Sequence, residues 1–356
     1  MKLGIFGLPL CGKTTVFRIL ARRNDLADAR GEAQQAVVKL PDERLQPLVD
    51  IYQPAKVSPA EITFVDTVSI QKGGSGRSES YSEMLKDADA WALVVRCFDL
   101  MGDDPAQAAI GDLESLTLEM ALTDLAIIER RLERLVKELR LGGKEAVAEN
   151  EVLTRCARHL EAGGLLRQLG LEGDDEKAIR GYSLLTMKPM LVVANVGDDL
   201  AGQAPLEDGQ ALAAFRVTCE EMGFESVAFC AELESEIQEL DPEEQAEFLA
   251  DYGIENPARE SFIRKCFDLL GLVTFFTGGP TEVHAWTIPA GSTAVEAAGK
   301  IHTDLARGFI RAEVIALDDL VDAGSEAECR ARGTSRLEGK TYEVKEADVV
   351  LVRFSV

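Results

Sequence analysis

Gly7-Leu8-Pro9-Leu10-Cys11-Gly12-Lys13-Thr14-Thr15 is the stretch that decides the fold of this 356-residue chain. It fits the pattern G-x-x-x-x-G-K-[ST] without a mismatch. The apolar residues 3–6 precede it, and residues 16–20 continue it as a helix-forming run. In a strand, glycine-rich loop and helix of this kind, backbone N–H groups and the positive end of the helix dipole converge on an anion. The sequence therefore predicts a nucleoside phosphate site.

Two side chains of this phosphate loop (residues 7–15) have specific predicted roles. Lys13 is expected to reach the β- and γ-phosphates and stabilise their charge, and the Thr14 hydroxyl is expected to ligate Mg²⁺. The residues expected to contact the nucleotide are Gly7, Leu10, Cys11, Gly12, Lys13, Thr14 and Thr15. The competing interpretation is a chance glycine turn, and the flanking strand and helix argue against it. We identify no general base in the sequence.

Composition excludes several classes of protein. A net charge of −24 argues against a generally basic nucleic-acid-binding protein, although the chain from about residue 272 is closer to neutral. No apolar run approaches the roughly 18 residues that a membrane span needs. The seven cysteines contain no C-x-x-C pair, so neither a zinc site nor a disulfide framework is indicated. The chain begins directly with a strand pattern, and we expect a reduced, cytoplasmic protein.

Strand-like apolar runs alternate with helical segments along most of the chain. The predicted strands lie at residues 36–40, 61–66, 90–98, 190–195 and 226–230. This alternation is typical of a doubly wound α/β sheet, in which ligands bind at the carboxyl ends of the strands. We therefore expect Asp66, Asn195 and Cys230 to lie near the phosphate loop. Asp66, at the end of its strand, is the expected second ligand of Mg²⁺.

The sequence Asn195-Val196-Gly197-Asp198 has the N-x-x-D form of a base-reading loop. In such a loop the Asn side chain holds the backbone and the acid accepts hydrogen bonds from the purine edge. The pattern alone is weak, because Asn and Asp are common in turns for local reasons. Its position after a buried strand makes it more specific. The predicted nucleotide contacts in this part of the chain are Asn195, Val196, Asp198, Cys230 and Ala231.

A different pattern separates the strand groups. Seven apolar residues recur at heptad spacing, and they are Leu118, Leu122, Leu125, Ile128, Leu132, Leu135 and Leu139. This repeat predicts a helix packed along one seam, and residues 144–160 predict a second helix that returns beside it. We interpret the pair as an inserted antiparallel hairpin. The alternative is two surface helices that lie flat on the sheet.

The last part of the chain predicts a small β-grasp-like domain. A hairpin is expected from residues 273–276 and 283–288, around Gly278-Gly279-Pro280. A helix is expected at 294–307, and further strands at 312–315, 342–344 and 349–354.

The chain resembles the YchF-type branch of the Obg-like P-loop ATPases and GTPases over essentially its whole length. The phosphate loop matches that family's G-L-P-x-x-G-K-[ST]-T, and the A-W-T-I-P sequence at 285–289 resembles its C-terminal TGS domain, a β-grasp module. The resemblance implies a P-loop NTPase domain at 1–111 and 176–271, a helical coiled-coil hairpin at 112–175, and a TGS-like domain at 272–356. It also implies ATP binding with Mg²⁺, with GTP possible, and a ribosome or RNA partner contacted through the hairpin and the C-terminal domain. We expect a monomer that does not associate with membranes.

Two departures from that family, and one position at which the family is itself hydrophobic, concern switching. The family's D-x-x-G is Asp66-Thr67-Val68-Ser69 here, and a Cβ restricts the swing of the backbone toward a γ-phosphate. Residues 22–40 contain no Ser or Thr to act as the switch threonine, and the side chain of Ile70 cannot orient water. We expect a purine-nucleotide-binding protein with weak Mg²⁺-dependent hydrolysis in ribosome-associated regulation. The alternative is a non-hydrolysing nucleotide-binding scaffold or sensor that interacts with RNA or the ribosome.

Several other residues allow a structural and a functional interpretation. Cys11 beside Lys13 is either a small core residue or a low-pKa, redox-sensitive thiol. His159, His284 and His302 lack the spacing of metal ligands. The arginines in 330–336 are typical of a solvated face, with RNA contact as the alternative. Trp91 is expected in the core.

Overall fold

The computed structural model describes residues 1–22, 34–67, 87–98, 102, 104–140, 144–201, 210–251 and 257–355. The chain divides into two compact units. The first unit contains Met1–Ala36 and Thr63–Phe262, and the second contains Val37–Ile62 and Ile263–Val356. Among the helices of these described residues, none is long and apolar enough to cross a membrane.

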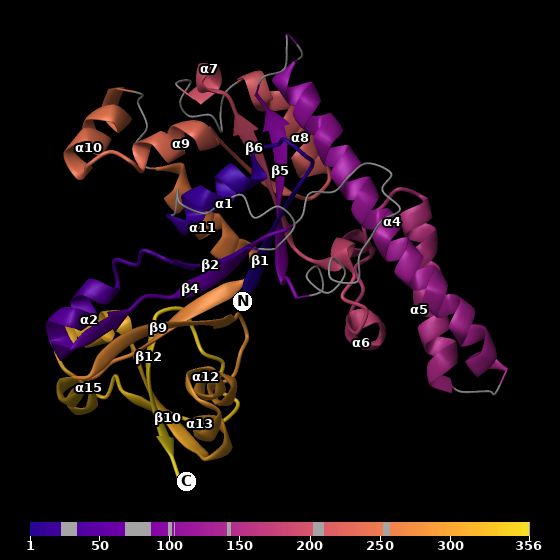
Figure 1. Cartoon of the computed structure of the whole chain (residues 1–356). Coiled ribbons are helices and arrows are strands. Elements are labelled where there is room, and N and C mark those ends of the chain that lie inside the picture. Colours follow the sequence, from indigo (N-terminus) through magenta and orange to yellow (C-terminus); the bar gives the residue numbers. More distant parts are fainter. Residues whose placement is uncertain are drawn as a thin grey trace. The chain divides into compact units, whose positions relative to one another are not determined.

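The first sheet has the strand order β2-β4-β1-β5-β6-β7. Its strands are β1 (Lys2–Gly7), β2 (Gln34–Lys39), β4 (Glu61–Asp66), β5 (Ala90–Cys97), β6 (Met190–Val196) and β7 (Glu225–Phe229). Strands β4, β1, β5, β6 and β7 run parallel to one another. Every residue of β6 is buried, because helices cover both faces of a parallel sheet. This arrangement confirms the predicted α/β fold class (Figure 1).

The helices of the first unit connect and cover these strands. They are α1 (Lys13–Ala21), α4 (Pro105–Leu139), α5 (Lys144–Glu161), η1 (Leu166–Leu169), α6 (Gly173–Arg180), η2 (Leu185–Met187), α7 (Asp198–Ala201), η3 (Gln210–Leu212), α8 (Ala213–Glu221), α9 (Ala231–Ile237), α10 (Pro242–Asp251) and α11 (Ala258–Leu269), which continues into the second unit. The core on one side of the sheet contains Phe6, Trp91 and Val192. Trp91 is fully buried, as expected.

Helix α4 is longer than the heptad pattern predicted, and its two halves pack differently. Its first half contributes Leu113, Leu116 and Met120 to the core of the sheet. Its second half packs Ile128 and Leu135 against α5, which lies alongside it (Figure 1). The predicted seam is therefore wrong at its start: the side chains of Leu118 and Leu122 are 57% and 47% exposed. The seven-residue spacing extends back into the first half of α4, where a different face of the helix packs against the sheet.

The second sheet has the order β11-β10-β12-β8-β9-β3. Its strands are β3 (Lys56–Ser58), β8 (Leu272–Thr277), β9 (Glu282–Pro289), β10 (Phe309–Ala316), β11 (Arg336–Glu338) and β12 (Asp348–Phe354), and its helices are α2 (Leu45–Tyr52), α12 (Ala294–Ile301), α13 (Thr303–Arg307), α14 (Leu317–Ala323) and α15 (Glu326–Arg332). The predicted hairpin is the antiparallel pair β8–β9, and β12 runs parallel to β8. Ala294, Ala297 and Ala298 of α12 pack into the core of this sheet. The small side chains allow the helix to approach the strands closely.

Two predictions for the second unit need correction. The helix expected at 294–307 is broken at His302, whose backbone is extended and whose Nδ1 accepts a hydrogen bond from the N–H of Asp304 at 3.1 Å. His302 therefore begins a second helix as its N-cap. Residues 342–344 do not form a strand and make only a single bridge, between Thr293 and Glu343. The strand that pairs with β10 at the edge of the sheet is β11.

The arginines in 330–336 fit the structural interpretation. Arg330 pairs with Glu313 and Glu326, Arg332 pairs with Glu328, and Arg336 lies near Glu338 and Asp348. The other two histidines also have structural partners. The Nε2 of His159 lies 3.0 Å from the carbonyl oxygen of Leu165, and the ring of His284 stacks on Trp286 with 3.7 Å between centroids.

Candidate functional site

Lys13 and Asp66 meet at the carboxyl edge of the first sheet. Lys13 is the first residue of α1, and its side chain is largely buried. Its Nζ donates hydrogen bonds to Oδ1 of Asp66 and to the carbonyl oxygen of Thr67. The Thr14 hydroxyl donates to Oδ2 of the same Asp66 at 3.3 Å. The last residue of β4 therefore lies where the sequence predicted it, against both the lysine and the threonine of the phosphate loop.

The backbone of the phosphate loop depends on Gly12. Its φ of +84° lies in the left-handed region, which residues with a Cβ rarely adopt. A Cβ at this position would also stand 2.1 Å from Nδ2 of Asn195. Leu10 adopts a φ of +68° at the tip of the loop, where its side chain is 83% exposed. At Gly7 a Cβ would lie 2.5 Å from Sγ of Cys11, so the start of the loop has no room for a side chain either.

We expect Gly12→Ala to weaken nucleotide binding by about tenfold or more, because the strained φ and the contact with Asn195 both displace the loop. Isothermal titration calorimetry with Mg²⁺ and ATP measures the change. Gly170→Ala is the matched control, since Gly170 also has a positive φ of +59° but no atom lies within 4 Å of its Cβ position. Equal binding by the two variants would contradict this prediction.

Asn195 joins two loops at the end of β6. Its Nδ2 donates to the carbonyl oxygen of Cys11 at 3.1 Å, and its Oδ1 accepts from the N–H of Ala231 at 3.0 Å. The side chain is buried, so both hydrogen bonds are shielded from water. The predicted role of Asn195, to hold the loop, agrees with these contacts. The amide links the phosphate loop to the start of α9.

The other residues predicted near the base lie around Asn195. Val196 is buried at the end of β6, and Asp198 is exposed at the start of α7, where its Oδ1 accepts from the N–H of Asp199. Cys230 and Ala231 are both buried at the start of α9. The Sγ of Cys230 accepts from the N–H of Leu233 at 3.5 Å, so this thiol caps the helix. Thr15 is half-buried in α1.

Cys11 is a core residue of the loop. Its side chain is 1% exposed, and burial raises the pKa of the thiol to about 11 despite the nearby Lys13. A thiol with this pKa stays protonated at neutral pH and reacts slowly with oxidants. The direction of the shift contradicts the low-pKa, redox-sensitive interpretation and favours the structural one.

The oxygens of Thr14 and Asp66 fit a magnesium ion. Mg²⁺ prefers hard oxygen ligands, and a hydroxyl beside a carboxylate is the usual pair that proteins offer it next to a triphosphate. Here both groups lie at the N-terminus of α1 and within hydrogen-bonding distance of one another. These residues therefore have the chemistry and the proximity that the ion needs.

Sequence reasoning missed two residues at this site. Thr67 follows Asp66, and its hydroxyl donates to the carbonyl oxygen of Ile5 in β1 at 2.6 Å, while its own carbonyl accepts from Lys13. Phe98 follows β5, and its ring lies 3.7 Å from the Cβ position of Gly12. Its place after a buried parallel strand is the signal that singled out Asp66 and Asn195, and it could have identified Phe98 as well.

The switch departures lie outside the described residues. Val68, Ser69 and Ile70 fall in 68–86, and most of the segment without Ser or Thr falls in 23–33. The effect of these departures on switching therefore stays a prediction.

Comparison with known proteins gives the same result at three levels. Residues 272–355 match the family YchF-GTPase_C, described as a protein of unknown function (DUF933). The chain is 40% identical over 367 residues to the ribosome-binding ATPase YchF of Pasteurella multocida (strain Pm70), covering 100% of this chain and 99% of that protein. It is 36% identical over 366 residues to the ribosome-binding ATPase YchF of Bacillus subtilis (strain 168), covering 99% of each.

A solved structure is also similar. The Schizosaccharomyces pombe YchF GTPase matches with a TM-score of 0.85 and 26% sequence identity, and the match covers 99% of this chain and 97% of that chain. The similarity therefore extends over both units and is not limited to the phosphate loop.

Proposed function

The chain belongs to the YchF family, and from this premise we propose that it binds ATP with Mg²⁺ at the phosphate loop and hydrolyses it slowly. The observation that carries the proposal is the convergence of Lys13 and Thr14 on Asp66, beside a loop whose backbone only glycine permits at position 12. The names of the two bacterial relatives specify ATP and the ribosome. ATP is therefore the nucleotide that we propose, and GTP is the comparison to test.

Each residue would contribute by position and charge. Lys13 would exchange its contact with Asp66 for the β- and γ-phosphate oxygens, where an ammonium stabilises developing negative charge. Thr14 and Asp66 would hold Mg²⁺, which supplies charge neutralisation on the triphosphate. The N–H groups of the loop and the N-terminus of α1 would orient the phosphates. We assign no general base, which is consistent with slow turnover.

The partner that we propose is the ribosome, in agreement with the names of the relatives. The hairpin formed by α4 and α5 and the second unit are the surfaces that we propose for this contact. We further propose that the protein is cytoplasmic and monomeric.

Steady-state phosphate release from ATP and GTP, measured together with calorimetric binding of both, tests the proposal. Binding of ATP with slow release of phosphate is the expected result. Tight binding without release would favour the non-hydrolysing scaffold, to which Ser69 in place of the glycine of D-x-x-G already points. Absence of binding to both nucleotides would contradict the proposed function.

Removal of the metal gives a sharper prediction. We expect chelation of Mg²⁺ to weaken ATP binding to the unchanged protein by about tenfold, because the metal screens the triphosphate charge. Asp66→Asn removes one ligand, and its ATP affinity should change little when EDTA is added. Calorimetry with and without EDTA measures both. Asp87→Asn is the control, since Asp87 is an exposed residue paired with Lys2; it should respond to EDTA as the unchanged protein does.

A further inference from the structure

Residues 37–62 run from the end of β2 to the start of β4, two strands of the first sheet, but they belong to the second unit. Strand β3 in this segment pairs in parallel with β9, with Lys56, Val57 and Ser58 opposite residues 282–284. The short strand therefore extends the C-terminal sheet at its edge. The segment between β2 and β4 is thus an integral part of a sheet that is otherwise formed by residues 272–354.

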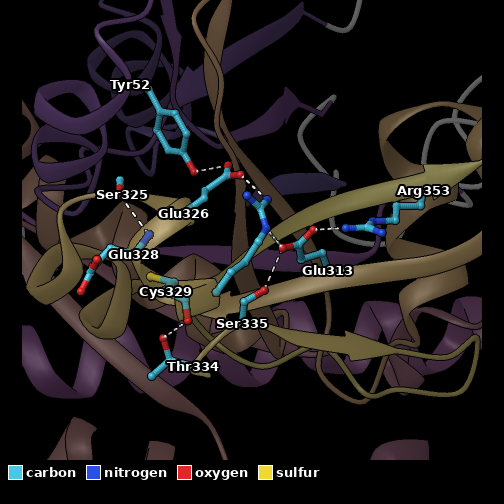
Figure 2. Close-up of polar contacts among 10 residues, drawn as sticks. Tyr52, Glu313, Ser325, Glu326, Glu328, Cys329, Thr334, Ser335 and Arg353 are labelled. Atoms are coloured by element: carbon cyan, nitrogen blue, oxygen red, sulfur yellow. Dashed lines mark hydrogen bonds and ion pairs between the residues drawn. The ribbon is translucent and has the colours of Figure 1, made fainter. Parts of the chain in front are cut away.

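Side chains strengthen this attachment. The hydroxyl of Tyr52 donates to Glu326 at 2.8 Å (Figure 2). The Tyr52 ring fills the space beside Gly278, where a Cβ would lie 2.2 Å from the ring. Next to it, the N–H of Ala55 donates to the carbonyl oxygen of Pro280 at 3.0 Å. At β3, the hydroxyl of Ser58 donates to the carboxylate of Glu282 at 2.6 Å.

Glu326 connects Tyr52 to a network of ion pairs around the buried carboxylate of Glu313. Arg330 contacts both Glu326 and Glu313, and Glu313 also pairs with Arg353 at 2.7 Å (Figure 2). The two arginines lower the pKa of Glu313, whose side chain is 3% exposed, to about 2. A fully ionised carboxylate held by two guanidinium groups is a rigid anchor, because moving it would leave a buried charge unpaired. The Tyr52 contact therefore ends on a fixed part of the second unit.

The connection from β3 back to the nucleotide site is short and stiff. Only Pro59 and Ala60 separate β3 from β4. The ring of Pro59 fixes its φ. Ala60 is buried, and its carbonyl oxygen accepts from the N–H of Leu40 at 2.8 Å. The joint is therefore short, with one backbone angle fixed by the proline ring and one carbonyl held by a hydrogen bond.

Strand β4 begins directly after the joint and ends six residues later at Asp66. There the carboxylate contacts both Lys13 and Thr14. One continuous strand thus carries the proposed metal ligand at one end and leads into the C-terminal sheet at the other.

We propose that the joint Pro59-Ala60 couples nucleotide binding at the phosphate loop to the sheet of the second unit. The inference rests on the nucleotide binding proposed above and names its regulation. Mg²⁺ and nucleotide would replace Lys13 as the partner of Asp66 at the end of β4, and the joint would transmit the resulting change to β3 and β9. Because coupling is reciprocal, a ligand of the second unit would alter nucleotide affinity by the same factor.

Hydrogen–deuterium exchange on the full chain tests the coupling, with Mg²⁺ and a non-hydrolysable ATP analogue as the probe. In the unchanged protein, we expect the analogue to change amide exchange in β3 and β9 by about fivefold or more. Insertion of Gly-Ser-Gly between Ser58 and Pro59 lengthens the joint and makes it flexible. We expect this variant to bind the analogue with unchanged affinity by calorimetry and to lose the response in β9.

The same insertion between Gly339 and Lys340, in an exposed turn of the second unit, is the matched control and should keep the response. If the insertion prevents folding, Pro59→Gly is the second variant. It relaxes the joint without changing its length and should reduce the response in β9. Binding without any response in β9 of the unchanged protein would overturn the coupling alone, as would a full response in both joint variants. If the unchanged protein does not bind the analogue, the proposed function itself is wrong.

Discussion

Replacing Lys13 with alanine is expected to weaken ATP binding by about 100-fold or more and to abolish phosphate release. The ammonium is the one side-chain cation that the structure places at the phosphate loop, among the residues it describes there. Its removal takes away the ammonium proposed to stabilise the β- and γ-phosphates and leaves Asp66 without the contact from Lys13. Both effects oppose the approach of an anionic ligand.

Calorimetry and a phosphate-release assay measure the effect of Lys13→Ala. Lys2→Ala is the matched control, because Lys2 lies in the same strand–loop–helix segment but forms an exposed pair with Asp87. Exposed pairs contribute little, so this variant should bind ATP normally. If Lys13→Ala binds and hydrolyses ATP as well as the control, the phosphate loop is not the nucleotide site.

Asp124→Ala is expected to destabilise the first unit by about 3 kcal/mol. Asp124 is fully buried in α4, and its carboxylate accepts from the N–H of Leu185 at 2.8 Å and from the N–H and hydroxyl of Thr186 at 2.8 and 2.7 Å. Alanine leaves these donors buried without an acceptor. Since η2 leads directly into β6, the substitution also loosens the strand that ends near Asn195.

Urea unfolding followed by circular dichroism measures this loss. Asp175→Ala removes a carboxylate from an exposed pair with Arg155 and should change the midpoint little. A midpoint for Asp124→Ala equal to that of Asp175→Ala would contradict the prediction.

The pH dependence of stability gives a second readout for Asp124. Burial raises the pKa of this carboxyl to about 6 in the folded protein, above its ordinary value of about 4. The folded state therefore holds the proton more tightly than the unfolded chain. The increment of stability that comes from this raised pKa is fully present below about pH 4 and is lost as the pH rises through about 6, whereas the hydrogen bonds that the carboxylate accepts from Leu185 and Thr186 remain. We expect Asp124→Asn to remove this decline, whereas a decline of equal size in the variant would assign it to another group.

Local patterns predicted how the side chains gather around the phosphate loop. The phosphate loop needs a glycine at a left-handed φ and a lysine at the start of a helix, and both requirements can be read from neighbouring residues. Asp66 and Asn195 follow buried strands, and parallel strands of one sheet end at the same edge. For this reason their convergence near Lys13 and Gly12 could be predicted across nearly 200 residues of sequence.

Heptad spacing predicted the helix but not its surroundings. Leucines at 118 and 122 fit the repeat as well as Ile128 and Leu135 do, yet only the latter two are buried. Periodicity specifies which residues share a face of the helix, whereas the partner of that face depends on where the helix leaves the sheet. The break at His302 escaped prediction for a related reason, because a histidine N-cap has no strong sequence signal.

The sequence by itself determined the phosphate loop, the alternation of buried strands with helices and the presence of helices at 105–161, because each depends on short-range spacing of apolar residues and glycines. Only the tertiary structure decided that residues 37–62 belong to the second unit and that β3 joins the C-terminal sheet. Three residues, Lys56 to Ser58, are too few to show a strand periodicity. Their pairing with β9 comes from an edge that chain segments more than 200 positions away create.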